Sequence, residues 1–113
     1  QIPISIIAGD AHMVAIDDGS NSDYAEGGGA PIPVFHAAPI DRYGTYKGGP
    51  YSMGYRARRG QYGVIEVEDE GGSEICLTWT AKDKSSDVVQ SSSGQDLTYR
   101  FCLPVASDLT RSI

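Results

Sequence analysis

Two alternating runs joined by a short turn constrain the fold of this chain more than any other sequence feature. The first run, residues 62–68, alternates apolar and polar side chains towards its end. In the second run, Ile75, Leu77 and Trp79 are each separated by one residue, and the turn at residues 69–73 contains two adjacent glycines. A period of two is typical of strands with one buried face, so the sequence predicts an antiparallel hairpin.

The rest of the chain also favours strands over helices. No apolar stripe with the 3.6-residue helical spacing continues for three turns, and 14 residues are Gly and 6 are Pro. We predict a buried strand over 2–8 and further strands over 32–38 and 97–103, while 13–16 fits either a strand or one helical turn. Pro33 favours an edge position or a strand end for its segment. The expected fold is mainly β, with short antiparallel strands in a sandwich-like arrangement and little helix.

Composition limits the number of domains and the kinds of partner. A chain of 113 residues and 12.0 kDa has room for a single domain or domain fragment, residues 1–113. Its formal charge of -6 argues against nucleic acid and against an anionic membrane surface, because both need a basic patch. No apolar run is long enough to span a bilayer, and the chain does not open like a signal peptide.

The two cysteines, Cys76 and Cys102, lie in segments predicted to be strands. Neighbouring antiparallel strands or facing sheets would bring them within disulfide range, so we predict a bond between them. Two buried reduced thiols are the alternative. Metal binding by this pair is disfavoured, because no second Cys or His stands at ligand spacing.

Several polar and aromatic groups have both a functional and a structural interpretation. An acidic loop suggests calcium, although a solvated loop is favoured; it contains Asp17, Asp18, Asn21, Asp23 and Glu26. The only basic cluster suggests phosphate contact, although a surface turn is favoured; it contains Arg56, Arg58 and Arg59. The tyrosines of the glycine-rich segment 41–60 could stack on sugars or a partner, but covering the sheet is favoured. We expect His36 to be a core residue or to support other ligands.

The segment from Ile6 to His12 carries the strongest chemical pattern. An apolar strand runs into Gly9 and is followed by Asp10 and His12, two residues apart. In extended backbone, residues i and i+2 project to the same side, so a carboxylate and an imidazole would converge at the strand end. This donor pair suits Zn, Fe or Mn. An ordinary turn with a surface histidine is the alternative.

An ordered series of short motifs begins at this segment. The series begins with Ala8–Met13 and Ala15–Gly19, and continues with Pro33–Arg42, Lys47–Ser52, Gly60–Val67 and Ile75–Thr80. Over roughly residues 4–81 the chain resembles the carboxyl-terminal part of alkaline phosphatase D-like metallophosphoesterases, which are calcineurin-like enzymes; residues 82–113 would add a strand and a tail. The resemblance implies half of an α/β sandwich around a two-metal centre holding Fe, Zn, Ca or Mn, with Asp10 and His12 at the metals.

The resemblance also implies that the metal site is incomplete. The family pattern requires an Asp-x-His, a bridging Asp and an Asn-His before the final motif, and no residues after His12 replace them. We therefore expect a fragment or subunit of a secreted phosphatase, inactive alone, with a second polypeptide supplying the other ligands. The start at Gln1, without Met, fits a processed chain or a piece of a longer one. The alternative is a secreted β-rich structural protein that assembles with copies of itself.

Overall fold

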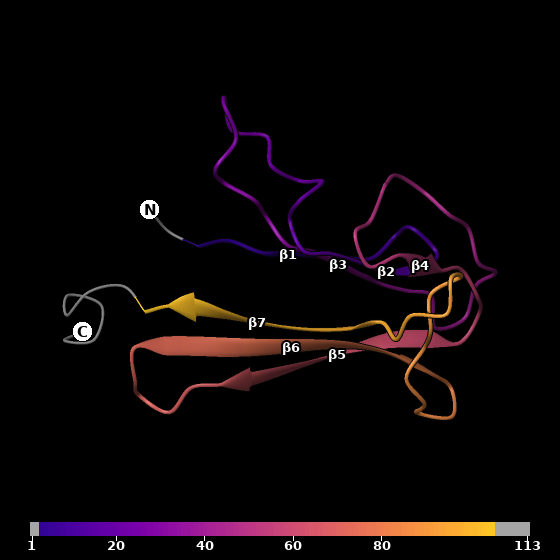
Figure 1. Cartoon of the computed structure of the whole chain (residues 1–113). Coiled ribbons are helices and arrows are strands. Elements are labelled where there is room, and N and C mark those ends of the chain that lie inside the picture. Colours follow the sequence, from indigo (N-terminus) through magenta and orange to yellow (C-terminus); the bar gives the residue numbers. More distant parts are fainter. Residues whose placement is uncertain (1–2, 106–113) are drawn as a thin grey trace.

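The computed structural model describes residues 3–105, and every regular element in this range is a β-strand. A four-stranded sheet has the order β1-β3-β2-β4 and a three-stranded sheet the order β5-β6-β7. Figure 1 shows the two sheets as stacked layers, so the prediction of a mainly β, sandwich-like fold is confirmed. The strands are β1 (Ile6–Ala8), β2 (Val14–Asp17), β3 (Val34–Ala37), β4 (Tyr55–Arg56), β5 (Gln61–Glu68), β6 (Glu74–Asp83) and β7 (Thr98–Pro104).

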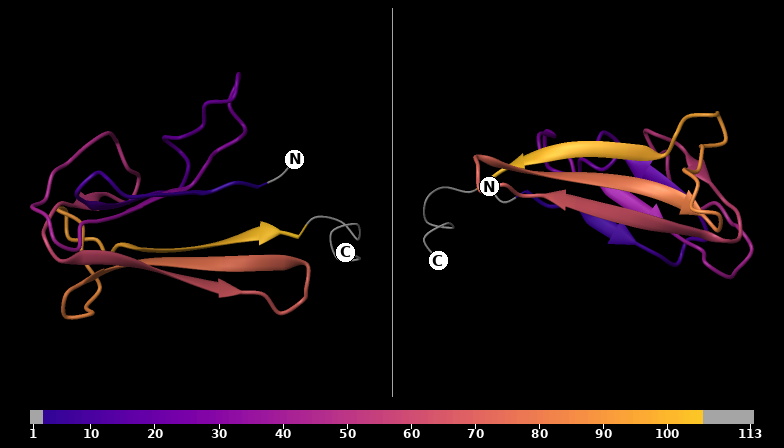
Figure 2. Two further views of the ribbon diagram at one scale, coloured as in Figure 1. Left: turned by 180° about the vertical axis from the view of Figure 1, so that it is seen from behind. Right: turned by 90° about the horizontal axis from the view of Figure 1, so that it is seen from below.

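The predicted hairpin is the long β5–β6 pair. Ile65 lies opposite Trp79 and Val67 lies opposite Leu77, so the apolar positions of both strands share one face. β7 pairs antiparallel with the other edge of β6, where Phe101 lies opposite Leu77. Figure 2 shows these three strands lying side by side and extending past the shorter strands of the other sheet. The apolar face of β5–β7 is therefore covered along only part of its length.

The four-stranded sheet differs from the expectation in one pairing. β1 runs parallel to β3, whereas β2 pairs antiparallel with both β3 and β4. The segment 13–16 belongs mostly to β2 and is not a helical turn. An edge position for the segment around Pro33 is wrong, because β3 lies between β1 and β2. Pro33 instead precedes the strand, where its missing N–H costs no ladder bond and its carbonyl accepts the Ile6 N–H at 2.9 Å.

β1 does not match the prediction of a buried strand over 2–8, of which Ile2 lies outside the described residues. Its regular part is three residues long and lies at the edge of its sheet. The side chains of Ile4, Ile6 and Ile7 are 58%, 44% and 57% exposed. An apolar run with both faces open is unusual for a strand with parallel pairing, because such strands are normally covered on both faces.

The core lies between the two sheets. Phe35 stacks against Trp79 at 5.4 Å between ring centroids, and Phe101 meets the Trp79 ring edge-on at 4.8 Å. All side-chain atoms of Trp79 and Phe35 are buried. Gly63 leaves room for Phe35 and Ala37 on the facing sheet. A Cβ at this position would lie 2.7 Å from the Ala37 Cβ and 2.8 Å from the Phe35 ring. The missing side chain at Gly63 therefore lets β5 lie close against Phe35 and Ala37 of β3.

The predicted disulfide is confirmed. Cys76 and Cys102 face each other directly on β6 and β7, and their sulfur atoms are bonded. Because side chains alternate along a strand, the bond lies on the opposite face of β6 from Trp79. With a sequence separation of 26 residues, the cross-link stabilises the fold by about 3–4 kcal/mol through the entropy of the unfolded chain.

Candidate functional site

The turn between β1 and β2 holds the two residues predicted to bind metal. Its backbone is not extended, because the N–H of Ala11 bonds to the Gly9 carbonyl and that of Met13 to the Ala11 carbonyl, both at 2.7 Å. Asp10 adopts a left-handed conformation with φ of 63°, which Asp tolerates better than most residues. The simple alternation that would project Asp10 and His12 to the same side therefore does not apply here.

Asp10 presents its carboxylate to solvent. Its side chain is 97% exposed, and its only ion pair within residues 3–105 is with the Lys47 ammonium, at 3.9 Å. The Lys47 side chain is itself 63% exposed, and pairs of this kind contribute little to stability. The carboxylate is therefore accessible and easily released from its neighbour.

His12 is held in a defined orientation by the long loop that follows β3. Its Nδ1 lies 3.0 Å from the Tyr43 carbonyl oxygen, and the Tyr43 ring packs edge-on against the imidazole. A carbonyl only accepts hydrogen bonds, so Nδ1 is the protonated nitrogen in this tautomer of the neutral ring. Nε2 then carries the lone pair. Fixing one ring nitrogen on a carbonyl is the usual way in which proteins prepare the other nitrogen for a metal.

The same loop is anchored at two further points. The N–H of Thr45 bonds to the His12 carbonyl at 2.9 Å, so the loop pairs with the turn on both sides of Gly44. A Cβ on Gly44 would overlap the backbone of Ala57. Gly44 thus lets the loop lie between His12 and the segment that follows β4.

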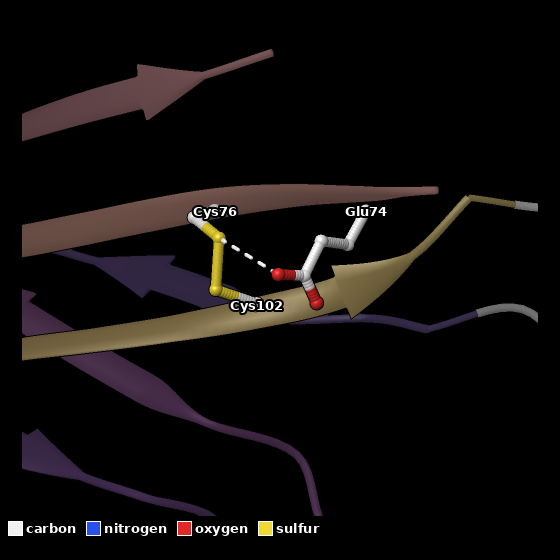
Figure 3. Close-up of side chains that lie close together, drawn as sticks. All are labelled: Glu74, Cys76 and Cys102. Carbon is white, nitrogen blue, oxygen red and sulfur yellow. Dashed lines mark hydrogen bonds between the residues drawn. A yellow bond between two sulfur atoms is a disulfide. The ribbon is translucent and has the colours of Figure 1, made fainter. Parts of the chain in front are cut away.

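No complete metal site lies within residues 3–105. The only group of three His, Cys, Asp or Glu ligand atoms there consists of Glu74, Cys76 and Cys102 (Figure 3). Its sulfur atoms form the disulfide and offer no thiolate, so this group does not suit a metal. The Cys76 sulfur lies 3.9 Å from a Glu74 oxygen, which is a contact only, because a disulfide sulfur carries no proton. Neither Asp10 nor His12 belongs to a group of three possible ligand atoms within residues 3–105.

The acidic loop is organised by its own carboxylates. Asp17 is 1% exposed and accepts hydrogen bonds from the backbone N–H groups of Gly19, Asn21 and Ser52 and from the Asn21 side chain. Asp23 accepts two more, from the backbone of residues 29 and 30. These contacts support a structural role for both side chains. The prediction that the acidic residues of this loop are solvated is therefore wrong for Asp17.

A groove that the sequence did not indicate lies on the side of the first sheet facing away from β5–β7. It encloses about 470 Å³ and is lined in part by Ile6, Val34, His36, Tyr24 and Tyr51. Burial lowers the pKa of His36, the nearby Gly9 backbone acts in the opposite direction, and burial raises the pKa of Tyr51. The Tyr51 hydroxyl donates to the Lys47 carbonyl at 2.6 Å and lies 3.5 Å from His36 Nε2. Burial thus favours the neutral form of His36, which lies partly buried beside the groove.

The tyrosines and the basic cluster each had a functional and a structural interpretation, and the structure does not favour the same one for all of them. Tyr51 and Tyr55 pack against Met13 and Ala15, so these two tyrosines cover the sheet as favoured. Tyr43 is 65% exposed. The three arginines of the basic cluster line one pocket together, which spacing in the sequence did not suggest.

Comparisons with known proteins do not assign the chain to a family. The chain matches no protein-family model, no curated protein and no solved structure. Within residues 3–105 there is also no helix long and apolar enough to cross a membrane.

Proposed function

We propose that this chain is the carboxyl-terminal part of a metal-dependent phosphoesterase and that Asp10 and His12 supply two ligands of its metal centre. The observation that carries the proposal is the hydrogen bond between His12 Nδ1 and the Tyr43 carbonyl, which leaves Nε2 available as a ligand. The motif series that resembles alkaline phosphatase D-like enzymes supports it. When bound, two metal ions would polarise the phosphate ester and activate a water molecule.

The other ligands would come from a polypeptide segment outside this chain. One carboxylate and one imidazole cannot hold two metal ions, and neither Asp10 nor His12 belongs to a group of three possible ligand atoms within residues 3–105. The open edge of β1 offers a place for that segment, since apolar side chains on both faces of β1 are exposed. Parallel strands bring their carboxyl ends to the same side of a sheet, so a strand added here would deliver its ligands close to the turn at Asp10.

The disulfide supports the part of this proposal that places the protein outside the cell. Disulfides persist in oxidising compartments and are rare in reducing ones. Cys76 is 6% exposed and bonded to Cys102, so the link belongs to the fold. A secreted phosphatase part is consistent with this chemistry.

A self-assembling structural protein is the second candidate. The exposed isoleucines of β1 and its neighbouring segment favour it, because an open apolar edge can pair with a second copy of the chain. In that case Asp10 and His12 would form an ordinary surface turn. The reading frame upstream of Gln1 separates the candidates: an Asp-x-His and a bridging Gly-Asp favour the enzyme, whereas a signal peptide directly before Gln1 favours the structural protein.

The activity test uses two proteins. The isolated chain should hydrolyse a generic phosphomonoester and phosphodiester only at background rates with Zn, Ca, Mn or Fe. A product that also contains an upstream ligand segment should show metal-dependent turnover, and His12→Ala should lower it at least about a hundredfold. Turnover by the isolated chain that His12→Ala abolishes would show that the site is complete without a partner. An active longer product insensitive to His12→Ala would remove His12 from the metal centre.

A further inference from the structure

The three arginines of the basic cluster surround a pocket that neither Asp10 nor His12 lines. Its walls come from β4, β5 and the polar segment after β6, and it encloses about 260 Å³. The lining consists of Arg56, Arg58, Arg59, Gln61, Asp83, Val88, Val89 and Gln90. In a chain with a formal charge of -6, this concentration of guanidinium groups in one hollow requires an explanation.

Arg56 is held in place by the fold. Its Nε donates to the Gln90 carbonyl and its Nη2 to the Ser91 carbonyl, each at 2.8 Å. These two bonds fix the plane of the guanidinium and leave Nη1 to donate elsewhere. A preorganised guanidinium of this kind loses little conformational entropy when it binds an oxyanion.

The turn that carries the other two arginines is also fixed. Gln61 is 2% exposed, and its Oε1 accepts the backbone N–H of Arg58 at 3.2 Å. That bond leaves the Gln61 amide N–H₂ as a further donor at the pocket wall. Gly60 has a φ of 80° and lies against the Lys84 stem, which places a fourth cation beside the turn.

The charges of the pocket do not cancel. Asp83 is the only carboxylate in the lining, and its Oδ1 accepts the backbone N–H groups of Ser85 and Asp87. Three positive charges and one negative charge leave the lining at +2. Arg59 also pairs with Asp41. Both side chains are mostly exposed, at 61% and 86%, so a bound anion can easily displace Asp41 from Arg59. Arg58 has no side-chain partner within residues 3–105.

We propose that this pocket binds a phosphate monoester dianion that carries a small apolar group. The phosphoryl oxygens accept from the guanidinium groups, with Arg58 as the main free donor, and the apolar group contacts Val88 and Val89. Val88 is 41% exposed and Val89 is 8% exposed, so the pocket has an apolar wall beside its cationic mouth. The proposal does not rest on the metal site.

Phenyl phosphate binding to the full chain, measured by calorimetry and by amide NMR shifts in dilute salt, tests this proposal. We expect saturable binding that Arg58→Ala weakens about tenfold, the usual cost of one charge-assisted contact. Arg58→Lys should weaken the binding of phenyl phosphate less than Arg58→Ala does. Arg100→Ala is the matched control, because Arg100 pairs with Glu68 on the other face of β5–β7 and does not line the pocket.

Two further ligands define what the pocket recognises. Inorganic phosphate should bind more weakly than phenyl phosphate, because it lacks the apolar group, and benzoate should bind more weakly because it carries a single charge. Absence of saturable phenyl phosphate binding would overturn the proposal, as would equal losses in Arg58→Ala and Arg100→Ala. Tighter binding of benzoate than of phenyl phosphate would overturn the choice of a phosphate dianion. Arg58 is exposed, so thermal unfolding should confirm that its variants remain folded.

Discussion

At the scale of single residues, Asp17 accepts more hydrogen bonds than any other charged side chain in the described chain. Burial alone would raise the pKa of this carboxyl group, but the bonds from Asn21, Ser52 and Gly19 outweigh burial and lower it. The Ser52 contact spans 35 positions of the sequence, so one carboxylate ties the loop after β2 to the segment before β4. The ionised form of Asp17 is therefore part of the folded structure.

Asp17→Asn should destabilise the protein by about 2–4 kcal/mol, because the amide keeps the shape but replaces one acceptor with a donor that faces N–H groups. Urea unfolding measures this loss. Asp69→Asn is the control, since Asp69 accepts one bond from Gly71 in an exposed turn and should change stability by less than about 0.5 kcal/mol. Equal effects of the two substitutions would contradict the role given to Asp17.

The same carboxylate predicts a dependence of stability on pH. Because the folded-state pKa of Asp17 lies below its unfolded value, its contribution is fully present above about pH 4. The contribution is lost as the pH falls through the lowered folded-state pKa. The difference in unfolding free energy between wild type and Asp17→Asn should therefore shrink below pH 4. A difference that stays constant down to pH 2 would contradict this assignment.

The sequence could not distinguish Asp17 from its acidic neighbours. Asp17, Asp18, Asn21 and Asp23 stand together in a polar stretch, and nothing in that stretch indicates that Ser52 approaches one of them. By contrast, Cys76 and Cys102 were predictable as a pair, because each lies in a run with clear strand character. Local patterns therefore identify what lies within a strand, whereas loop contacts between distant segments need the fold.

At the scale of elements, the loop between β3 and β4 determines the position of the candidate metal ligand. Tyr43 and Thr45 of this loop bond to His12 on both sides of Gly44. The loop itself is supported by Ala57, whose backbone a Gly44 Cβ would overlap.

Gly44→Ala should push the loop away from His12 and destabilise the protein by about 1–3 kcal/mol, the usual cost of overpacking. Urea unfolding measures the stability, and the NMR resonances of the His12 ring report the loss of its Tyr43 contact. Gly72→Ala is the matched control, because a Cβ at Gly72 meets nothing within 4 Å. Unchanged His12 resonances in Gly44→Ala would show that the loop does not orient the imidazole.

The strands illustrate where periodicity succeeds and where it fails. Alternation identified β5 and β6, because one face of each strand packs on the core and the other meets solvent. The apolar run before Gly9 was expected to be buried, yet Ile6 and Ile7 are exposed at the sheet edge. Hydrophobicity shows that a strand needs cover, but it cannot show whether the same chain provides that cover.

At the scale of the whole molecule, the open edge of β1 predicts association. Sedimentation at micromolar concentration should reveal species heavier than 12.0 kDa, either self-assembled or in complex with a second polypeptide. Ile7→Lys should reduce self-association and change stability by no more than about 0.5 kcal/mol, because Ile7 is 57% exposed. Ile40→Lys, at a position that is 77% exposed in a loop, should leave association unchanged.

A single 12.0 kDa species with one cooperative unfolding transition would contradict the need for a partner. Equal effects of Ile7→Lys and Ile40→Lys would mean that association does not use β1.

The metal-ligand role proposed for His12 is tested most directly by NMR of the imidazole nitrogens in mildly alkaline buffer. We predict a protonated Nδ1 and an unprotonated Nε2 on His12, as its bond to the Tyr43 carbonyl requires. Zinc should then shift Nε2 of His12, weakly because no group of three possible ligand atoms within residues 3–105 includes this residue, and Asp10→Ala should reduce that shift. A protonated Nε2, or a zinc response at His36 with none at His12, would contradict the proposed metal site.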